Sequence, residues 1–144
     1  MSERPRATGV VLAHGDMARG LVDAVRKISG QEDALVPLSN DGVSPGALRE
    51  RLEHLLGSGP AVVFTDLQAG SCALAAVATA RREDTVVLCG ANLPMLLDFV
   101  FHRELPLDQL AERLVEKGKQ GIGSLRPRPA SAEVSSDERD GCAG

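Results

Sequence analysis

The chain has 144 residues and a formal net charge of −4 at pH 7, with 43% hydrophobic but only 2% aromatic residues. This length fits one domain with a substantial core, which must be built mainly from aliphatic side chains. The acidic balance and the scarcity of aromatic residues argue against nucleic-acid binding. The three cysteines are widely spaced, which favours reduced thiols and excludes a metal-binding CxxC pattern.

Two further features bear on where the protein works and where its domain ends. The sequence has no apolar run long enough to span a membrane and no apolar segment typical of a signal peptide, so we expect a cytoplasmic protein. We place the domain at residues 1–125. Proline, serine, arginine and acidic residues dominate residues 126–144, a composition that predicts a disordered, linker-like tail.

Strand and helix patterns alternate along the predicted domain. Runs of aliphatic residues predict strands at 9–13, 35–38, 61–65 and 85–89. Apolar residues at helical spacing, with Ser, Pro or Asn near several of the starts, predict helices at 17–29, 45–56, 72–81, 93–101 and 106–115. Ser71 is the expected N-cap of the third helix, and residues 118–125 are expected to hold a short final strand.

The alternation predicts an α/β fold with a mostly parallel four-stranded sheet flanked by helices, because strand–helix–strand units cross over in a right-handed sense. The simplest order for these strands is 2-1-3-4. Its switch point lies between the first and third strands, which are followed by His14 and Asp66. Ligands of such sheets bind at this rim. We therefore expect these two residues, 52 positions apart in the chain, to meet there.

His14 is the candidate nucleophile. An unprotonated imidazole has one ring nitrogen with an available lone pair near neutral pH. A carboxylate that accepts a hydrogen bond from the other ring nitrogen fixes the tautomer and stabilises the cation formed on phosphorylation. Asp66 is the expected orienting carboxylate, and the pair therefore indicates phosphoryl transfer.

Donors for the phosphoryl oxygens follow the third strand. The backbone N–H groups of Gly70, Ser71 and Cys72, with the Ser71 hydroxyl, lie at the start of a predicted helix whose positive end favours an anion. Gly15 allows one more N–H to approach without a Cβ. This arrangement needs no metal ion or other cofactor. The sequence also contains neither a Walker loop nor a dinucleotide-binding glycine motif.

A plainer interpretation of the same residues stays open. A histidine after a strand is often a hydrogen-bonded surface residue, so the contact of His14 with Asp66 is incidental in this alternative. We interpret His54, on a solvated helix face, and His102, near a helix end, as structural. Cys72 and Cys89 are expected to be small core residues.

Three segments together resemble one known family. They are Val10–Gly15, Thr65–Ser71 and Gly90–Leu96, which occur in this order at comparable spacing. They are similar to the IIA component of the mannose-type bacterial sugar phosphotransferase system. The similarity covers residues 8–125.

The resemblance implies an assembly and a set of partners. Members of this family are cytoplasmic homodimers in which an antiparallel edge strand, matched here by residues 121–125, is exchanged between subunits. The family histidine accepts phosphate from the phosphocarrier protein HPr and passes it to a IIB domain. We expect IIB to be a separate polypeptide here, and association with the membrane components IIC and IID to occur only through it.

The resemblance also assigns residues to roles. His14 matches the phosphoryl acceptor, Asp66 the orienting carboxylate and Ser71 the helix-start serine. The loop expected to shape the wall of the site consists of Asn92, Pro94 and Met95.

One motif departs from the family pattern, and two other functions stay open. The usual Gly-Gly-Ser-Pro is here Ala69-Gly70-Ser71-Cys72. The Cβ of Ala69 is expected to matter if the backbone there needs positive φ, whereas Cys72 loses the preset φ of proline but gains an N–H donor.

One alternative function is a regulatory binding module whose phosphorylation state controls another protein. The other is a phosphoryl donor subunit for a dihydroxyacetone kinase.

Overall fold

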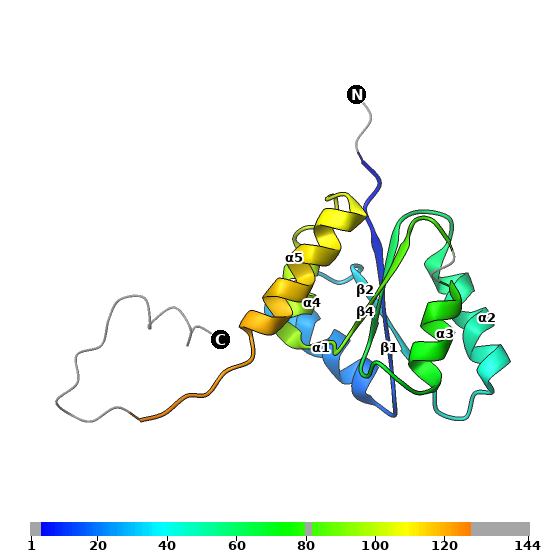
Figure 1. Ribbon diagram of the computed structural model, residues 1–144, viewed down its shortest axis with the longest axis horizontal. Helices are drawn as coiled ribbons and strands as arrows, with labels where there is room; N and C mark the ends of the chain where they lie inside the picture. The colour runs from blue at the N-terminus through cyan, green and yellow to red at the C-terminus, as the bar shows by residue number, and fades with distance from the viewer. Residues whose placement is uncertain (1–3, 80–81, 128–144) are drawn as a thin grey trace.

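Figure 1 shows the computed structural model of the chain, which describes residues 4–79 and 82–127. Within these residues the strands are β1 Thr8–Ala13, β2 Leu35–Ser39, β3 Ala61–Thr65 and β4 Thr85–Cys89. The helices are α1 Met17–Ser29, α2 Pro45–Leu56, α3 Ser71–Thr79, α4 Leu93–Val100 and α5 Leu107–Gln120. The predicted strands and the first four predicted helices agree with these bounds to within about two residues wherever the structure describes the chain.

The four strands pair in parallel in the order β2-β1-β3-β4, which confirms the predicted topology. The register pairs Leu12 of β1 with Thr65 of β3, and Ala13 of β1 with Ser39 of β2. The C-terminal ends of these three strands therefore lie side by side. The residues that follow β1 and β3 meet at this rim, as expected at the switch point of the sheet.

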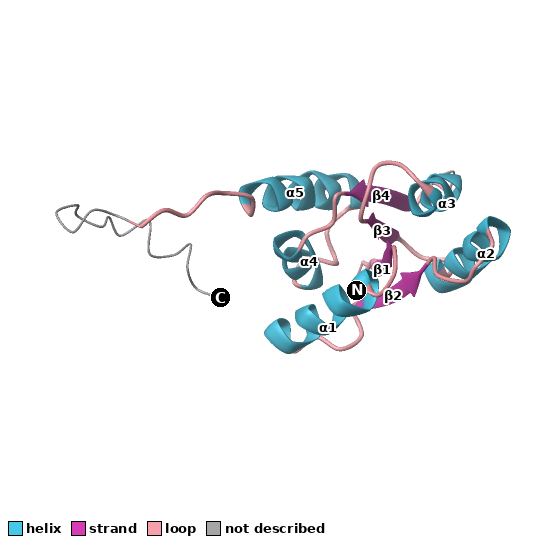
Figure 2. Ribbon diagram, turned by 90° about the horizontal axis from the view of Figure 1, so that it is seen from below, coloured by secondary structure: helices cyan, strands magenta, loops and turns pink. Residues whose placement is uncertain are grey.

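Helices cover both faces of the sheet. In Figure 2, α1, α4 and α5 lie on one face, and α2 and α3 lie on the other. Successive strand residues point to opposite faces, so Val11 packs in the first layer and Val10 in the second. In the first layer the rings of Phe64 and Phe99 meet edge to face, with centroids 5.2 Å apart. Burial on both faces explains why the strands are continuous aliphatic runs.

Helix starts follow the sequence signals in two cases and differ in one. Ser44 caps α2 by accepting the N–H of Ala47, and Asn92 caps α4 by accepting the N–H of Met95. The prediction that Ser71 is an N-cap is wrong by one residue. The carbonyl of Gly70 accepts the N–H of Leu74 at 3.0 Å, so Gly70 is the cap and Ser71 is the first residue of α3.

The C-terminal part of the domain differs most from prediction. Residues 118–120, part of the segment predicted to hold a short final strand, belong to the last turn of α5. Tertiary contact decides this: the side-chain amide of Asn92 donates to the carbonyl of Gly118 at 2.9 Å, and α4 approaches so closely that a Cβ at Gly118 would lie 2.9 Å from Met95. Residues 121–127 form no strand in the described chain, and their exchange with a second subunit stays a prediction.

Two predicted segments extend beyond the residues that the structure describes. Residues 80–81 of the predicted third helix and residues 128–144 of the predicted tail lie outside the described residues. Among the helices of residues 4–79 and 82–127, none combines the length and the apolar character that a membrane crossing requires.

Candidate functional site

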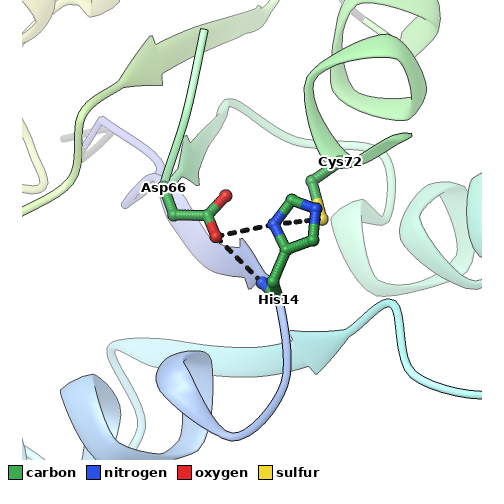
Figure 3. A group of neighbouring side chains, drawn as sticks. All are labelled: His14, Asp66 and Cys72. Carbon is green, nitrogen blue, oxygen red and sulfur yellow. Dashed lines mark hydrogen bonds and ion pairs between the residues drawn. The ribbon is translucent and has the colours of Figure 1, made fainter. Parts of the chain in front are cut away.

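His14 and Asp66 form the centre of the candidate site. The Nδ1 atom of His14 lies 2.8 Å from Oδ2 of Asp66, and the backbone N–H of His14 donates to the same oxygen at 3.0 Å. Figure 3 shows the imidazole beside the carboxylate, with the thiol of Cys72 behind the ring. The structure thus brings together two residues that are 52 positions apart, as the predicted strand order requires.

Asp66 is held in place through both carboxylate oxygens. Oδ2 accepts from His14, and Oδ1 accepts the backbone N–H of Leu67 at 3.0 Å. Burial of the side chain, which is 9% exposed, raises the pKa of Asp66. The hydrogen bonds from His14 and Leu67 and the charge of His14 outweigh burial, so the pKa of Asp66 lies below its ordinary value of 3.8. The carboxylate is therefore ionised at neutral pH.

The pairing through Nδ1 leaves Nε2 as the reactive atom of His14. A neutral imidazole carries one proton, and an ionised carboxylate can only accept, so the proton of the neutral ring resides on Nδ1. Nε2 then carries the lone pair. The His14 side chain is 43% exposed, so part of the imidazole ring reaches solvent.

Gly70 lies directly beside Nε2. Its φ of +102° is a conformation that L side chains rarely adopt, and a Cβ at this position would lie 3.8 Å from Nε2 of His14. Because Gly70 caps α3, the free N–H groups of the first turn of the helix start next to the reactive nitrogen. Non-glycine residues with positive φ do not occur in the described chain, so Ala69 carries none of the strain considered above.

Cys72 packs against the imidazole as a buried thiol. Its Sγ lies 3.9 Å from Nδ1 of His14, and the residue has no exposed surface. Burial raises the pKa of the Cys72 thiol, and the nearby negative charge of Asp66 raises it further. Cys72 therefore behaves as the small core residue that its sequence context predicts.

The same three side chains offer one ligand atom each, all within 4.8 Å of one another, a spacing at which a metal ion is sometimes held. In this structure Nδ1 of His14 and Oδ2 of Asp66 are joined to each other by a direct hydrogen bond.

Two residues at the end of β2 belong to the site but escaped the sequence analysis. The Ser39 hydroxyl donates to the carbonyl of Gly15 at 2.7 Å, and the side-chain amide of Asn40 donates to the Ser71 hydroxyl at 3.3 Å. Gly15 itself turns the chain out of β1 with a φ of +58°. The available signal was their position, since Ser39 ends β2 and Asn40 follows that strand as His14 follows β1.

The predicted wall of the site is largely engaged within the fold. Asn92 uses its side-chain oxygen to cap α4 and its amide to bind α5. Pro94 lies against Gly121 at the end of α5. Asn92 and Met95 line a hollow of about 420 Å³ together with Gln68 from the β3–α3 loop, so the wall adjoins the loop that follows Asp66 without being placed against His14.

A family comparison agrees with this geometry. The EIIA-man family, described as the fructose IIA component of the phosphotransferase system, matches residues 9–116. The chain belongs to this family. The match includes all strands and helices of the described chain except the first residue of β1 and the end of α5. It supports a phosphotransferase-system IIA role for the chain. No match was found among curated proteins.

Solved structures of similar proteins share the fold. The EIIA component from Streptococcus agalactiae is 25% identical with a TM-score of 0.77, covering 82% of this chain and 96% of that one. The mannose/sorbose specific IIA subunit from Enterococcus faecalis is 21% identical with a TM-score of 0.77, covering 88% and 100%. A IIA protein associated with the fucose utilization operon of Streptococcus pneumoniae is 19% identical with a TM-score of 0.72, covering 85% and 96%.

Proposed function

We propose that the protein is a phosphoryl carrier in which Nε2 of His14 accepts phosphate from HPr and donates it to a separate IIB protein in the cytoplasm. The observation that carries this proposal is that the two ring nitrogens of His14 have different neighbours. Asp66 holds Nδ1 at 2.8 Å, and the other nitrogen lies near Gly70 on a ring that is 43% exposed. This is the arrangement that a nucleophilic imidazole requires.

The proposed step is an in-line displacement at phosphorus. The Nε2 lone pair forms a bond to the phosphorus, and the bond to the donor imidazole breaks with its electron pair returning to the donor. The ring of His14 becomes cationic, and the ionised carboxylate of Asp66 stabilises that charge. The N–H groups of Gly15, Gly70, Ser71 and Cys72, with the Ser71 hydroxyl, are proposed to receive the phosphoryl oxygens, so transfer needs no metal ion.

Exposed apolar side chains beside the site suit a carrier that exchanges phosphate with other proteins. Leu67 lies in the loop that follows Asp66 and is 58% exposed; Leu74 and Val77 of α3 are 74% and 60% exposed. Apolar groups gathered at a surface mark sites of protein contact. We therefore place the docking surface for HPr and IIB on α3 and the preceding loop.

The second part of the proposal is a homodimer. β4 is an edge of the described sheet, and residues 121–127 leave α5 without pairing to a strand. Ile122 and Leu125 in this segment are 76% and 87% exposed, which is unfavourable unless a partner covers them. In the proposed dimer, residues 121–125 of each subunit pair antiparallel with β4 of the other. Light scattering on the full chain is expected to give a dimer, and Ile122→Asp with Leu125→Asp a monomer. A wild-type monomer would contradict this part.

The carrier function has a direct test. The protein is incubated with phosphoenolpyruvate, enzyme I and HPr, and the label is tested for the acid lability and base stability of phosphohistidine. We expect His14→Ala to abolish labelling. His102→Ala is the matched control because its side chain is comparably exposed at 33%, and it should label like the wild type. Labelling of His14→Ala to the wild-type level refutes the proposal. Subsequent transfer to a IIB protein separates a carrier from a purely regulatory module.

A further inference from the structure

Asn40 is the residue of the rim whose side chain contacts the helix-start serine. It follows β2, and its backbone is fixed on both sides: its N–H donates to the carbonyl of Ala13, and its carbonyl accepts the N–H of Val43. The side chain then reaches across the rim, and Nδ2 donates to Oγ of Ser71 at 3.3 Å. Because these hydrogen bonds fix the backbone of Asn40, its side-chain amide extends from a fixed position between β1 and α2.

The direction of this hydrogen bond determines what the Ser71 hydroxyl is free to do. A hydroxyl has one proton to donate and two lone pairs to accept with. Because Nδ2 of Asn40 can only donate, it occupies a lone pair of Oγ. The Ser71 proton is left to donate elsewhere. Ser71 is the first residue of α3, next to the Gly70 cap that lies beside Nε2 of His14.

The other amide atom of Asn40 is buried and unsatisfied. Oδ1 has no hydrogen-bond partner among the described residues, and only Thr85 contributes another buried side-chain atom of this kind there. Among the described residues, the side-chain amide of Asn40 therefore has the Ser71 hydroxyl as its hydrogen-bond partner, and this contact fixes how the amide is oriented.

We infer that Asn40 is a positioning residue for phosphoryl transfer: it holds the Ser71 hydroxyl with its proton directed at the phosphoryl group on His14. The inference rests on the proposed function, because it assigns a donor to the phosphohistidine. It adds the residue that follows β2 to a site otherwise built from the ends of β1 and β3. Asn40 acts only through Ser71 and touches no reacting atom.

A double-mutant cycle tests the inference. Wild type, Asn40→Ala, Ser71→Ala and the double variant are phosphorylated by HPr and, separately, by phosphoramidate, which needs no partner protein. Rates and the ³¹P chemical shift of phosphohistidine are measured. We expect each single change to slow phosphorylation about three- to tenfold, the value of one oriented hydrogen bond. The double variant should be no slower than Ser71→Ala and should share its chemical shift.

A variant that replaces the amide donor of Asn40 with an acceptor adds a second test to the double-mutant cycle. Asn40→Asp presents an acceptor to Ser71 and draws the serine proton away from the phosphoryl group, so it should slow the wild-type background more than Asn40→Ala does. In the Ser71→Ala background the difference between these two variants measures only the added charge. Asp41→Ala, at the exposed neighbouring residue, is the control and should keep the wild-type rate. Thermal unfolding confirms that each variant is folded.

The outcomes separate the two proposals. If wild type takes up phosphate on His14 but the losses from Asn40→Ala and Ser71→Ala simply add, the positioning role is wrong and the carrier function stands. An Asn40→Asp rate at or above that of Asn40→Ala, once the charge effect is subtracted, also overturns it. If wild type takes no label from either donor, both proposals fall together.

Discussion

Two histidines of this chain each lie within reach of an aspartate, and the two pairs differ in how the acid is used. His14 binds Asp66, and His102 lies 3.4 Å from a carboxylate oxygen of Asp98. The exposures are similar: 43% and 33% for the histidines, 9% and 10% for the acids. Residue type and burial alone therefore do not distinguish a candidate active site from a structural contact.

The difference lies in the other partners of each pair. Asp98 is bound by Arg113 through two hydrogen bonds of 2.7 and 3.1 Å, which raise the pKa of Arg113. The Nδ1 atom of His102 lies 2.8 Å from the backbone carbonyl of Asp98, within one helix. Within residues 4–79 and 82–127, by contrast, the ion pairs of Asp66 involve His14 alone. Under the proposed function, Asp66 has no arginine or lysine partner in the described part of the chain and is therefore available to stabilise the charge that forms on His14.

Exchanging each acid for its amide is the strongest way to break this comparison. In Asp66→Asn the new side-chain amide can donate to Nδ1, which moves the ring proton to Nε2 and removes the nucleophile. We expect the rate of phosphorylation to fall about a hundredfold or more. Asp98→Asn should change that rate less than about twofold, because it alters only the contacts of Asp98 with Arg113 and His102. Equal losses in the two variants, measured with phosphorylated HPr, would show that the pairs are not functionally distinct.

The open face of the His14 ring is the next feature to test. In Gly70→Ala a residue with a Cβ is forced to a φ of +102°, so the loop must shift or be strained, at a cost of about 1–3 kcal/mol. We expect slower phosphorylation, by about tenfold, because the N–H groups move away from Nε2. Gly57→Ala is the matched control, since Gly57 has a φ of +64° but no atom near its Cβ position. It should lose stability and keep the rate; a slow Gly57→Ala would point to a global effect.

The next prediction concerns how the contribution of Asp66 to the free energy of unfolding changes at acid pH. The folded-state pKa of Asp66 is depressed below its ordinary value of 3.8. Its contribution to stability is therefore fully present above that value and is lost as the pH falls through the lower folded-state pKa. The free energy of unfolding, measured in urea, should differ between wild type and Asp66→Asn at neutral pH. This difference should shrink below pH 3.8. A gap that widens on acidification contradicts the assigned direction.

The smallest expected effect concerns the thiol behind the His14 ring. Cys72 is fully buried and its pKa is raised, so iodoacetamide should modify it far more slowly than the partly exposed Cys89. Peptide mapping after a timed reaction gives the two rates. Cys72→Ala removes the sulfur contact with the ring and should change the phosphorylation rate by less than about threefold. Rapid alkylation of Cys72 would show that the ring does not stay packed against it.

The sequence alone was sufficient for the sheet and for the central pair of the site. Continuous aliphatic runs are typical of parallel strands buried on both faces, and short crossovers leave few strand orders. The order 2-1-3-4 then brings the ends of β1 and β3 together, so His14 and Asp66 could be paired without coordinates. Helix caps such as Ser44 and Asn92 were also predictable because they are local hydrogen bonds.

Contacts between distant segments required the tertiary structure. Glycine on its own disfavours a helix, yet Gly118 lies within α5. The close approach of α4 explains this, because only a residue without a side chain fits at that position. Asn40 joins the site only because the end of β2 faces the start of α3. The carboxylate of Asp98, which lies near His102, is bound by Arg113 only because another helix brings Arg113 to it. Periodicity and capping act over a few residues, whereas packing depends on which surfaces the folded chain brings into contact.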